Sequence, residues 1–142
     1  MKVSARNAFK GHIATIHPGA INSEVTIQTA GGDTLVAIVT VSSAQSLGLT
    51  VGKEVVALVK APWVMLATHE CGLKFSARNQ LTGAVSTITK GAVNTEVGIT
   101  QPGGTEVFAV VTNEAVAELG LAAGKQATAI IKASHIILAI PA

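Results

Sequence analysis

The feature that most constrains the fold is a tandem repeat in the sequence. Residues 4–7, Ser-Ala-Arg-Asn, recur without a gap as residues 76–79. Along the offset that these two segments define, roughly four positions in ten are identical, far above the level that two unrelated segments would reach. We therefore interpret the chain as two copies of one module, residues 1–69 and residues 73–142, joined by a linker at residues 70–72.

Each copy shows the pattern of about five short strands and one helical turn. In the first copy, strands are predicted where polar and apolar residues alternate or β-branched residues dominate, at residues 13–17, 23–28, 34–41, 54–59 and 63–66. The stretch from Ser43 to Gly48 favours a short helix between the third and fourth strands, because glycine commonly follows a helix end. This order is typical of an oligonucleotide/oligosaccharide-binding (OB) barrel. The predicted fold is all-β: two tandem OB-like five-stranded β-barrel modules, each with one short helix.

The small size of the module predicts extensive packing between modules. A module of about 70 residues is near the lower limit for a domain that is stable alone. The chain has one cysteine, Cys71, so neither an internal disulfide nor a cysteine-built metal site can supplement its core. We therefore expect the modules to bury further apolar surface against each other and against other chains, with Trp63 as interface material.

Charge and composition exclude several classes of function. The ten Lys and Arg and eight Asp and Glu give a net charge of +2, which is too small and too dispersed for a strong nucleic-acid binder. With one Trp, three Phe and no Tyr, the chain also lacks platforms for stacking single-stranded bases. Its apolar stretches are too short to span a bilayer, and its first residues do not form a signal peptide. We therefore expect a cytoplasmic protein that binds neither nucleic acid nor membranes.

The charges that recur in both copies are mostly positive. Of the eight acidic residues, only Glu24 and Glu96 correspond to each other. A residue that a site needs in each module should occur in both copies, so the pattern indicates a module built to bind an anion. The alternative is that the cations were inherited by duplication and serve only folding or solubility. Eight of the ten cationic residues form repeat pairs: Lys2 and Lys74, Arg6 and Arg78, Lys53 and Lys125, and Lys60 and Lys132.

Two of these cations stand where a ligand has room to approach. Small residues precede Arg6 and follow Lys60, and Arg offers a rigid fork of N–H donors beside the compact charge of Lys. Thr40 and Thr112 stand where a predicted strand meets the helix, so a hydroxyl and free N–H groups can face an anion there. The four histidines have no histidine counterparts, and no catalytic set recurs. We therefore expect a binding protein rather than an enzyme, without a cofactor or a bare metal cation.

Four motifs that occur in the same order in both copies resemble the Mop domain of the molbindin family. They are S-A-R-N, G-A-(V/I)-N-x-E-V, L-G-L-x-x-G-K and K-A, and together they extend along nearly the whole chain. The arrangement is similar to the two-module, or di-Mop, form of that family. The resemblance implies OB-like barrels that bind molybdate or tungstate between subunits, a homo-oligomer that is expected to be a trimer, and a role in intracellular molybdenum storage or homeostasis.

The resemblance also implies two sets of anion contacts. The copies differ at two of the positions, because Ser43 corresponds to Ala115 and Pro62 corresponds to Ser134, so the two sites should differ in affinity. The first set follows the S-A-R-N motif, the strand-to-helix junction and the K-A motif: Ser4, Arg6, Thr40, Ser43, Lys60, Ala61, Ser76, Arg78, Thr112, Lys132, Ala133 and Ser134. A second set is expected near the symmetry axis: Gly19, Ala20, Ile21, Asn22, Gly91, Ala92, Val93 and Asn94.

Two alternative functions remain open from the residues. An OB fold also occurs in nucleic-acid-binding proteins, although such a protein needs exposed aromatic residues and a basic groove. The other alternative is a purely structural β-oligomer, in which the repeated cations only bridge to carboxylates. The single repeated acidic pair, Glu24 and Glu96, offers few repeated partners for that role.

Overall fold

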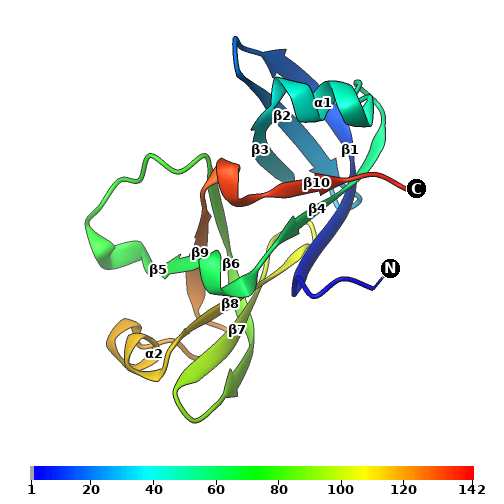
Figure 1. The fold of residues 1–142 in the computed structure, drawn as a ribbon. Helices are drawn as coiled ribbons and strands as arrows, with labels where there is room; N and C mark the ends of the chain where they lie inside the picture. Colours follow the sequence, from blue (N-terminus) through cyan, green and yellow to red (C-terminus); the bar gives the residue numbers. More distant parts are fainter. Residues whose placement is uncertain (1) are drawn as a thin grey trace.

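The computed structural model describes residues 2–142 and contains two five-stranded antiparallel sheets with one α-helix beside each (Figure 1). This arrangement agrees with the predicted all-β fold and with a helix between the third and fourth strands of each copy. The first copy contains β1 (Asn7–Pro18), β2 (Asn22–Thr29), β3 (Thr34–Thr40), α1 (Val41–Leu47), β4 (Glu54–Val59), η1 (Ala61–Trp63), β5 (Met65–Ala67) and η2 (His69–Cys71). The second contains β6 (Asn79–Lys90), β7 (Asn94–Thr100), β8 (Glu106–Thr112), α2 (Asn113–Leu119), β9 (Gln126–Ile131), η3 (Ala133–His135) and β10 (Ile137–Ala139).

The two copies exchange their last strands. The sheet orders are β10-β4-β1-β2-β3 and β5-β9-β6-β7-β8. Leu138 of β10 pairs with Ala57 of β4, and Leu66 of β5 pairs with Ala129 of β9. Figure 1 shows the red β10 lying in the upper lobe beside β4, and the green β5 lying in the lower lobe beside β9. Because each sheet is completed by a strand of the other copy, the copies cannot separate without opening two ladders.

The apolar core runs through both copies as one cluster. Alternate residues of each strand point inward, as the period of a β-strand requires, so Ile27 and Leu35 in the first copy and Ile99 and Ile131 in the second are fully buried. The exchanged segments add the buried Leu138 to this cluster. No helix among the residues described is long and apolar enough to cross a membrane.

The long first strand of each copy pairs with two neighbouring strands because it bends. Its pairing with the second strand shifts register between Ile13 and Thr15 in β1, and between Val85 and Thr87 in β6. Two residues before each shift, a glycine lies where the backbone of the second strand approaches closely: a Cβ on Gly11 would lie 2.4 Å from the carbonyl oxygen of Gln28. A bulge of this kind increases strand twist, which lets β1 pair with β4 at one end and β2 at the other.

Candidate functional site

The repeated arginine and lysine of each copy adjoin the end of an antiparallel ladder. The ladder between β1 and β4 ends with Asn7 opposite Val59, and Arg6 and Lys60 are the next residues of the two segments. The ladder between β6 and β9 ends with Asn79 opposite Ile131, and Arg78 and Lys132 are the next residues there. Both lysines immediately precede a 3₁₀ helix whose first residue, Ala61 or Ala133, is buried.

Each of these cationic pairs lies against the other copy of the module. The helix η1, which follows Lys60, packs on β8, and η3, which follows Lys132, packs on β3. The strands β8 and β3 end at Thr112 and Thr40. The segment that follows each repeated lysine therefore packs on the strand that leads to the other copy's strand-to-helix junction, an arrangement that depends on the exchange of the last strands.

The two junction threonines cap the short helices. The Thr40 hydroxyl oxygen accepts the N–H of Ser43 at 3.0 Å, and its hydroxyl donates to Ser43 Oγ at 2.8 Å. Thr112 accepts the N–H of Ala115 at 3.1 Å. A cap of this kind satisfies one of the unpaired N–H groups of the helix start. The structure thus gives both threonines a structural role, and leaves the Ser43 hydroxyl proton as a donor in the first copy alone.

The repeated arginines contact the only repeated acidic pair, across the two copies. Arg6 Nε donates to Glu96 Oε1 at 3.3 Å, and its guanidinium lies 3.5 Å from the centre of the Phe108 ring. Arg78 forms a fork: Nη1 lies 2.5 Å from Glu24 Oε2, and Nη2 lies 3.0 Å from Glu24 Oε1. All four side chains are partly exposed. Each arginine thus already faces an oxyanion, the carboxylate of the other copy.

The fork at Arg78 shifts the ionisation of both partners. The hydrogen bonds from Arg78 lower the pKa of Glu24 below its ordinary value of 4.5; partial desolvation opposes this, and the charges of Arg78 and His17 reinforce it. The same carboxylate raises the pKa of Arg78. Because the folded pKa of Glu24 is depressed, the pair's contribution to stability is present above the ordinary glutamate pKa and is lost as pH falls through the folded value.

An acid titration should detect this effect. We expect the carboxyl ¹³C resonance of Glu24 to titrate below the ordinary pKa of 4.5, and we expect Arg78→Ala to raise that pKa because the hydrogen-bond donor is removed. The matched control is Lys90→Ala, which removes one positive charge from an exposed residue that has no cationic counterpart in the other copy. An unchanged Glu24 pKa in Arg78→Ala would contradict the fork.

The asparagine of the repeated S-A-R-N motif fastens the copies together. Asn7 donates from Nδ2 to the carbonyl of Phe108 at 2.8 Å and accepts the Phe108 N–H at 2.7 Å. Asn79 does the same with Val36, at 2.8 Å in both directions. Phe108 and Val36 lie on β8 and β3, each an edge strand of its sheet. Sequence reasoning missed this role, although the recurrence of asparagine in both motifs was its signal.

Trp63 and His135 occupy equivalent positions of the repeat and contact each other. Their ring centres lie 4.8 Å apart with an interplanar angle of 43°. His135 Nδ1 is buried without a hydrogen-bond partner within residues 2–142. Lys60 Nζ lies 6.0 Å from the Trp63 ring centre. The 3₁₀ helices η1 and η3 therefore meet here, and Trp63 packs against the other copy, as predicted, while staying 48% exposed.

The loops predicted as the second set border the first set but lie far from each other. Asn22 pairs with Thr40 and Asn94 pairs with Thr112 in the ladders, so each loop adjoins a capped helix start. The loops close on themselves, since Gly19 donates to the Asn22 carbonyl at 2.8 Å. In Figure 1 the β1–β2 turn lies at the top and the β6–β7 turn at the bottom. One chain does not bring these two loops together.

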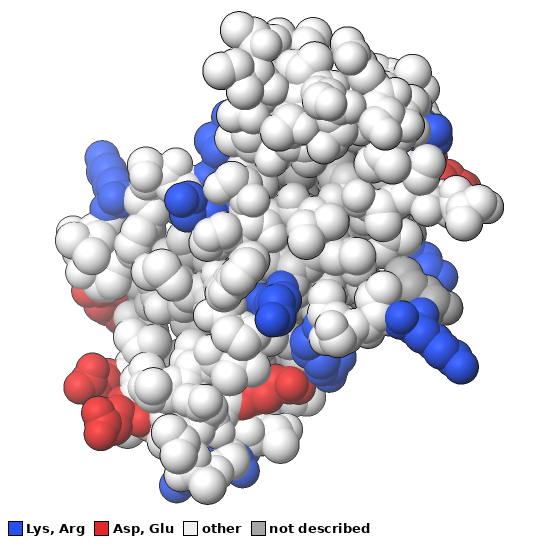
Figure 2. Space-filling model, viewed as in Figure 1, with Lys and Arg blue, Asp and Glu red and all other residues white. Residues whose placement is uncertain are grey.

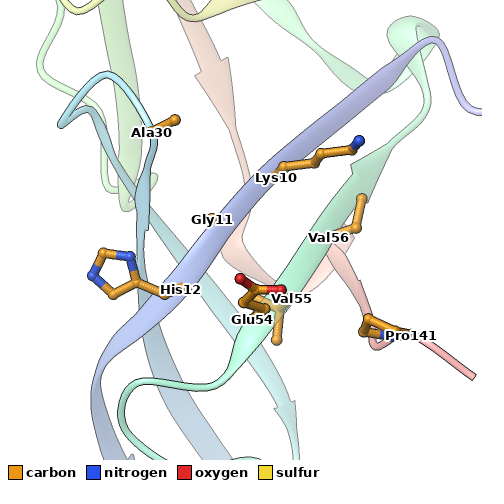
Figure 3. A pocket seen from close by; sticks show the side chains of 8 residues that line it. All are labelled: Lys10, Gly11, His12, Ala30, Glu54, Val55, Val56 and Pro141. Carbon is orange, nitrogen blue, oxygen red and sulfur yellow. The ribbon is translucent and has the colours of Figure 1, made fainter.

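Two cavities within residues 2–142 lie away from the predicted first set. The predicted first-set side chains other than the buried alanines are exposed, and none of these residues lines either of the two cavities. A cavity of about 440 Å³ opens over β1 and β4 (Figure 3), and one of about 400 Å³ lies where the hairpin turns of the two copies meet. The larger is lined by Lys10, Gly11, His12, Ala30, Glu54, Val55, Val56 and Pro141. Within a single chain the predicted cations are exposed on the surface and do not line these cavities.

Comparison with known proteins identifies the family. A model of the TOBE domain matches the chain twice, over residues 3–66 and residues 76–138. The chain belongs to the TOBE-domain family. Among solved structures it resembles the cytoplasmic molybdate-binding protein ModG, in a crystal form with molybdate bound, at 58% identity and a TM-score of 0.94. That match covers 99% of this chain and 100% of the ModG chain, and it confirms the predicted tandem OB-type fold.

Curated relatives carry the same tandem TOBE segment within longer chains. This chain is 46% identical over 140 residues to the molybdenum transport protein ModE of Azotobacter vinelandii. It is 43% identical over 141 residues to the molybdenum-pterin-binding protein MopA of Rhodobacter capsulatus. Each match covers 99% of this chain but 52% and 53% of the relatives, so the chain spans about half their length. The predicted resemblance to Mop proteins is confirmed.

Proposed function

We propose that this tandem TOBE protein binds molybdate or tungstate and serves intracellular molybdenum storage or homeostasis as a binding protein rather than an enzyme. The observation that carries the proposal is its full-length likeness to ModG, a protein solved with molybdate bound. The position of the repeated cations supports it, because Arg6 and Lys60, like Arg78 and Lys132, directly adjoin the last pair of a ladder, and both arginines contact the other copy. The first-set residues are our proposed contacts.

The chemistry of the proposed site suits a fully deprotonated tetrahedral anion. Molybdate at neutral pH is a dianion with four acceptor oxygens and no proton, so a site made of guanidinium, ammonium, hydroxyl and N–H groups satisfies it with donors alone. Hydrogen phosphate would place an O–H against a donor, and the unpaired group would cost roughly 1–3 kcal/mol. Sulfate has the right charge but is smaller, so the size of the closed site must reject it. Molybdate and tungstate are nearly equal in size.

We infer that a second copy of the chain closes the site, with a trimer as the expected assembly. The proposed contacts other than the two buried alanines are exposed in one chain, and equivalent apolar residues are exposed in both copies. Ile21 and Val93 are 75% and 71% exposed, and Met65 and Ile137 are 58% and 63% exposed. Met65 and Ile137 lie on the edge strands β5 and β10, and an apolar edge strand favours pairing with another chain.

The same observations argue against a nucleic-acid or membrane partner. Figure 2 shows Lys and Arg scattered in separate places over the face it presents, where they do not form one continuous basic stripe. Trp63 contacts the His135 ring at a tilted angle and Phe108 lies under Arg6, so neither ring is arranged as a free platform for bases. We propose a cytoplasmic location on the likeness to ModG. No activity of the remaining half of the longer relatives is assigned to this chain.

The molybdenum content of the purified protein and its mass in solution test the proposal together. We expect calorimetry to show molybdate binding to an oligomer, weak or absent binding of phosphate and sulfate, and a molybdate-dependent rise in melting temperature. A ligand at one hundred times its Kd stabilises the folded state by about 2.7 kcal/mol. Equal melting curves with and without saturating molybdate, together with no heat of binding, would leave the purely structural β-oligomer as the better description.

A further inference from the structure

We propose that Glu24 is an affinity-determining residue that makes the two arginine sites unequal: Glu24 must leave Arg78 before an oxyanion can bind the two terminal nitrogens of that guanidinium, whereas Glu96 leaves the terminal nitrogens of Arg6 open. This inference rests on the proposed function. It concerns two residues that are not among the proposed donors, and it follows from how each carboxylate contacts the guanidinium of the other copy.

The outer edge of Arg78 is occupied by a carboxylate. Glu24 engages both terminal nitrogens, with Nη1–Oε2 at 2.5 Å and Nη2–Oε1 at 3.0 Å. A guanidinium presents its donors in a fixed planar fork, and the Nη1–Nη2 edge is one of its two positions for bidentate binding of an oxyanion. A molybdate that took this edge would have to displace Glu24, because a dianion and a carboxylate repel each other at that distance.

Among residues 2–142, no carboxylate forms a hydrogen bond with the same edge of Arg6. Glu96 contacts Arg6 only through Nε, at 3.3 Å. The aromatic ring of Phe108 supports the guanidinium from one face at 3.5 Å, an attractive cation–π arrangement. Arg6 can therefore receive an anion on its Nη1–Nη2 edge while Glu96 remains bound at Nε and holds the side chain in place.

A difference between the copies in the repeat explains the two geometries. Phe108 corresponds to Val36 in the first copy, and both residues accept the same asparagine clamp. Valine has no π face to hold a guanidinium, so Arg78 has no counterpart to the ring contact of Arg6 and lies end-on to Glu24 instead. The register is otherwise matched, since Glu24 pairs with Ile38 and Glu96 with Val110.

Single substitutions of the two glutamates test the inference. In calorimetric titrations of the assembled protein with molybdate, Glu24→Gln should tighten the weaker class of sites by about two- to fivefold, the range for an exposed ion pair. Glu96→Gln should leave both classes within error of the charge control, Glu118→Gln, an exposed α2 residue. Glu24→Asp keeps the charge but shortens the side chain, so it should tighten binding in the same direction.

A double-mutant cycle ties the effect to Arg78. In an Arg78→Ala background, Glu24→Gln should change the affinity no more than Glu118→Gln does. The inference is overturned if wild-type protein binds molybdate and Glu24→Gln matches the charge control, or if Glu24→Gln weakens binding, since Glu24 would then position the arginine. Absence of molybdate binding by the wild type would instead overturn the proposed function, and this inference with it.

Discussion

Replacing both Arg6 and Arg78 with alanine is expected to weaken molybdate binding by roughly 10- to 100-fold while leaving a folded oligomer. The estimate follows from the loss of hydrogen bonds to a charged group, each worth about 1.5–3 kcal/mol. The fold should survive because both arginines are half-exposed and their ion pairs with Glu96 and Glu24 are screened by water. Equilibrium dialysis against molybdate measures the loss, and size-exclusion chromatography with light scattering checks the assembly.

A matched control separates the arginine fork from total charge. Lys10 and Lys90 are the two cations without repeat partners, and both are exposed. The double variant Lys10→Ala/Lys90→Ala removes the same charge as the double arginine variant, and it should bind molybdate nearly as well as the wild type. Normal binding by the double arginine variant would show that the proposed contacts are wrong, even if the protein binds molybdate elsewhere.

Replacing Asn7 and Asn79 with alanine is expected to have the largest effect on stability. Each asparagine is almost fully buried and pairs with both the N–H and the C=O of one residue on an edge strand, Phe108 or Val36. Alanine would leave those backbone groups without a partner, and each substitution should lower the free energy of unfolding by about 1–3 kcal/mol. Urea denaturation at fixed protein concentration measures the change.

Amide hydrogen exchange shows which backbone hydrogen bonds are lost in the two asparagine variants. The amides of Phe108 and Val36 should exchange faster in Asn7→Ala and Asn79→Ala respectively, because each loses its side-chain acceptor. The control is Asn94→Ala at the exposed first residue of β7, which should change the free energy of unfolding by less than about 0.5 kcal/mol. If the Asn79→Ala variant is as stable as this control, the asparagine clamp contributes nothing to holding the copies together.

Most of the fold could be predicted because its signals are local. The alternation of apolar residues predicted the strands, and Gly48 ends α1 in the left-handed conformation with φ of 62°, as a glycine after a helix end suggests. The repeat itself also predicted which residues should recur in sites, and it selected Arg6 and Lys60, which directly adjoin the Asn7–Val59 pair of the ladder and stay predicted contacts. These features depend only on neighbouring residues or on the comparison of the two copies.

The partners of the repeated side chains could not be predicted in the same way. The arginines were expected to face a bound anion, and in the chain they contact Glu96 and Glu24. No role was predicted for Asn7 and Asn79, although their side chains hydrogen-bond to the backbone of β8 and β3. In each case the partner belongs to the other copy. A contact between residues so far apart in sequence produces no periodic pattern in the local sequence from which it could be predicted. The proposed contacts of the anion remain predictions for the same reason.

The exchange of β5 and β10 separates what the sequence predicts from what only the tertiary structure decides. The two strands occupy equivalent positions of the repeat, and a backbone ladder forms through N–H and C=O groups that every residue shares. The residues of the repeat therefore specify that each sheet needs a fifth strand, but the same pattern fits either copy's strand. Which copy supplies the fifth strand of each sheet is decided by the path of the chain in space. The helix η1 packs on β8 and η3 packs on β3, so each final strand joins the sheet of the other copy.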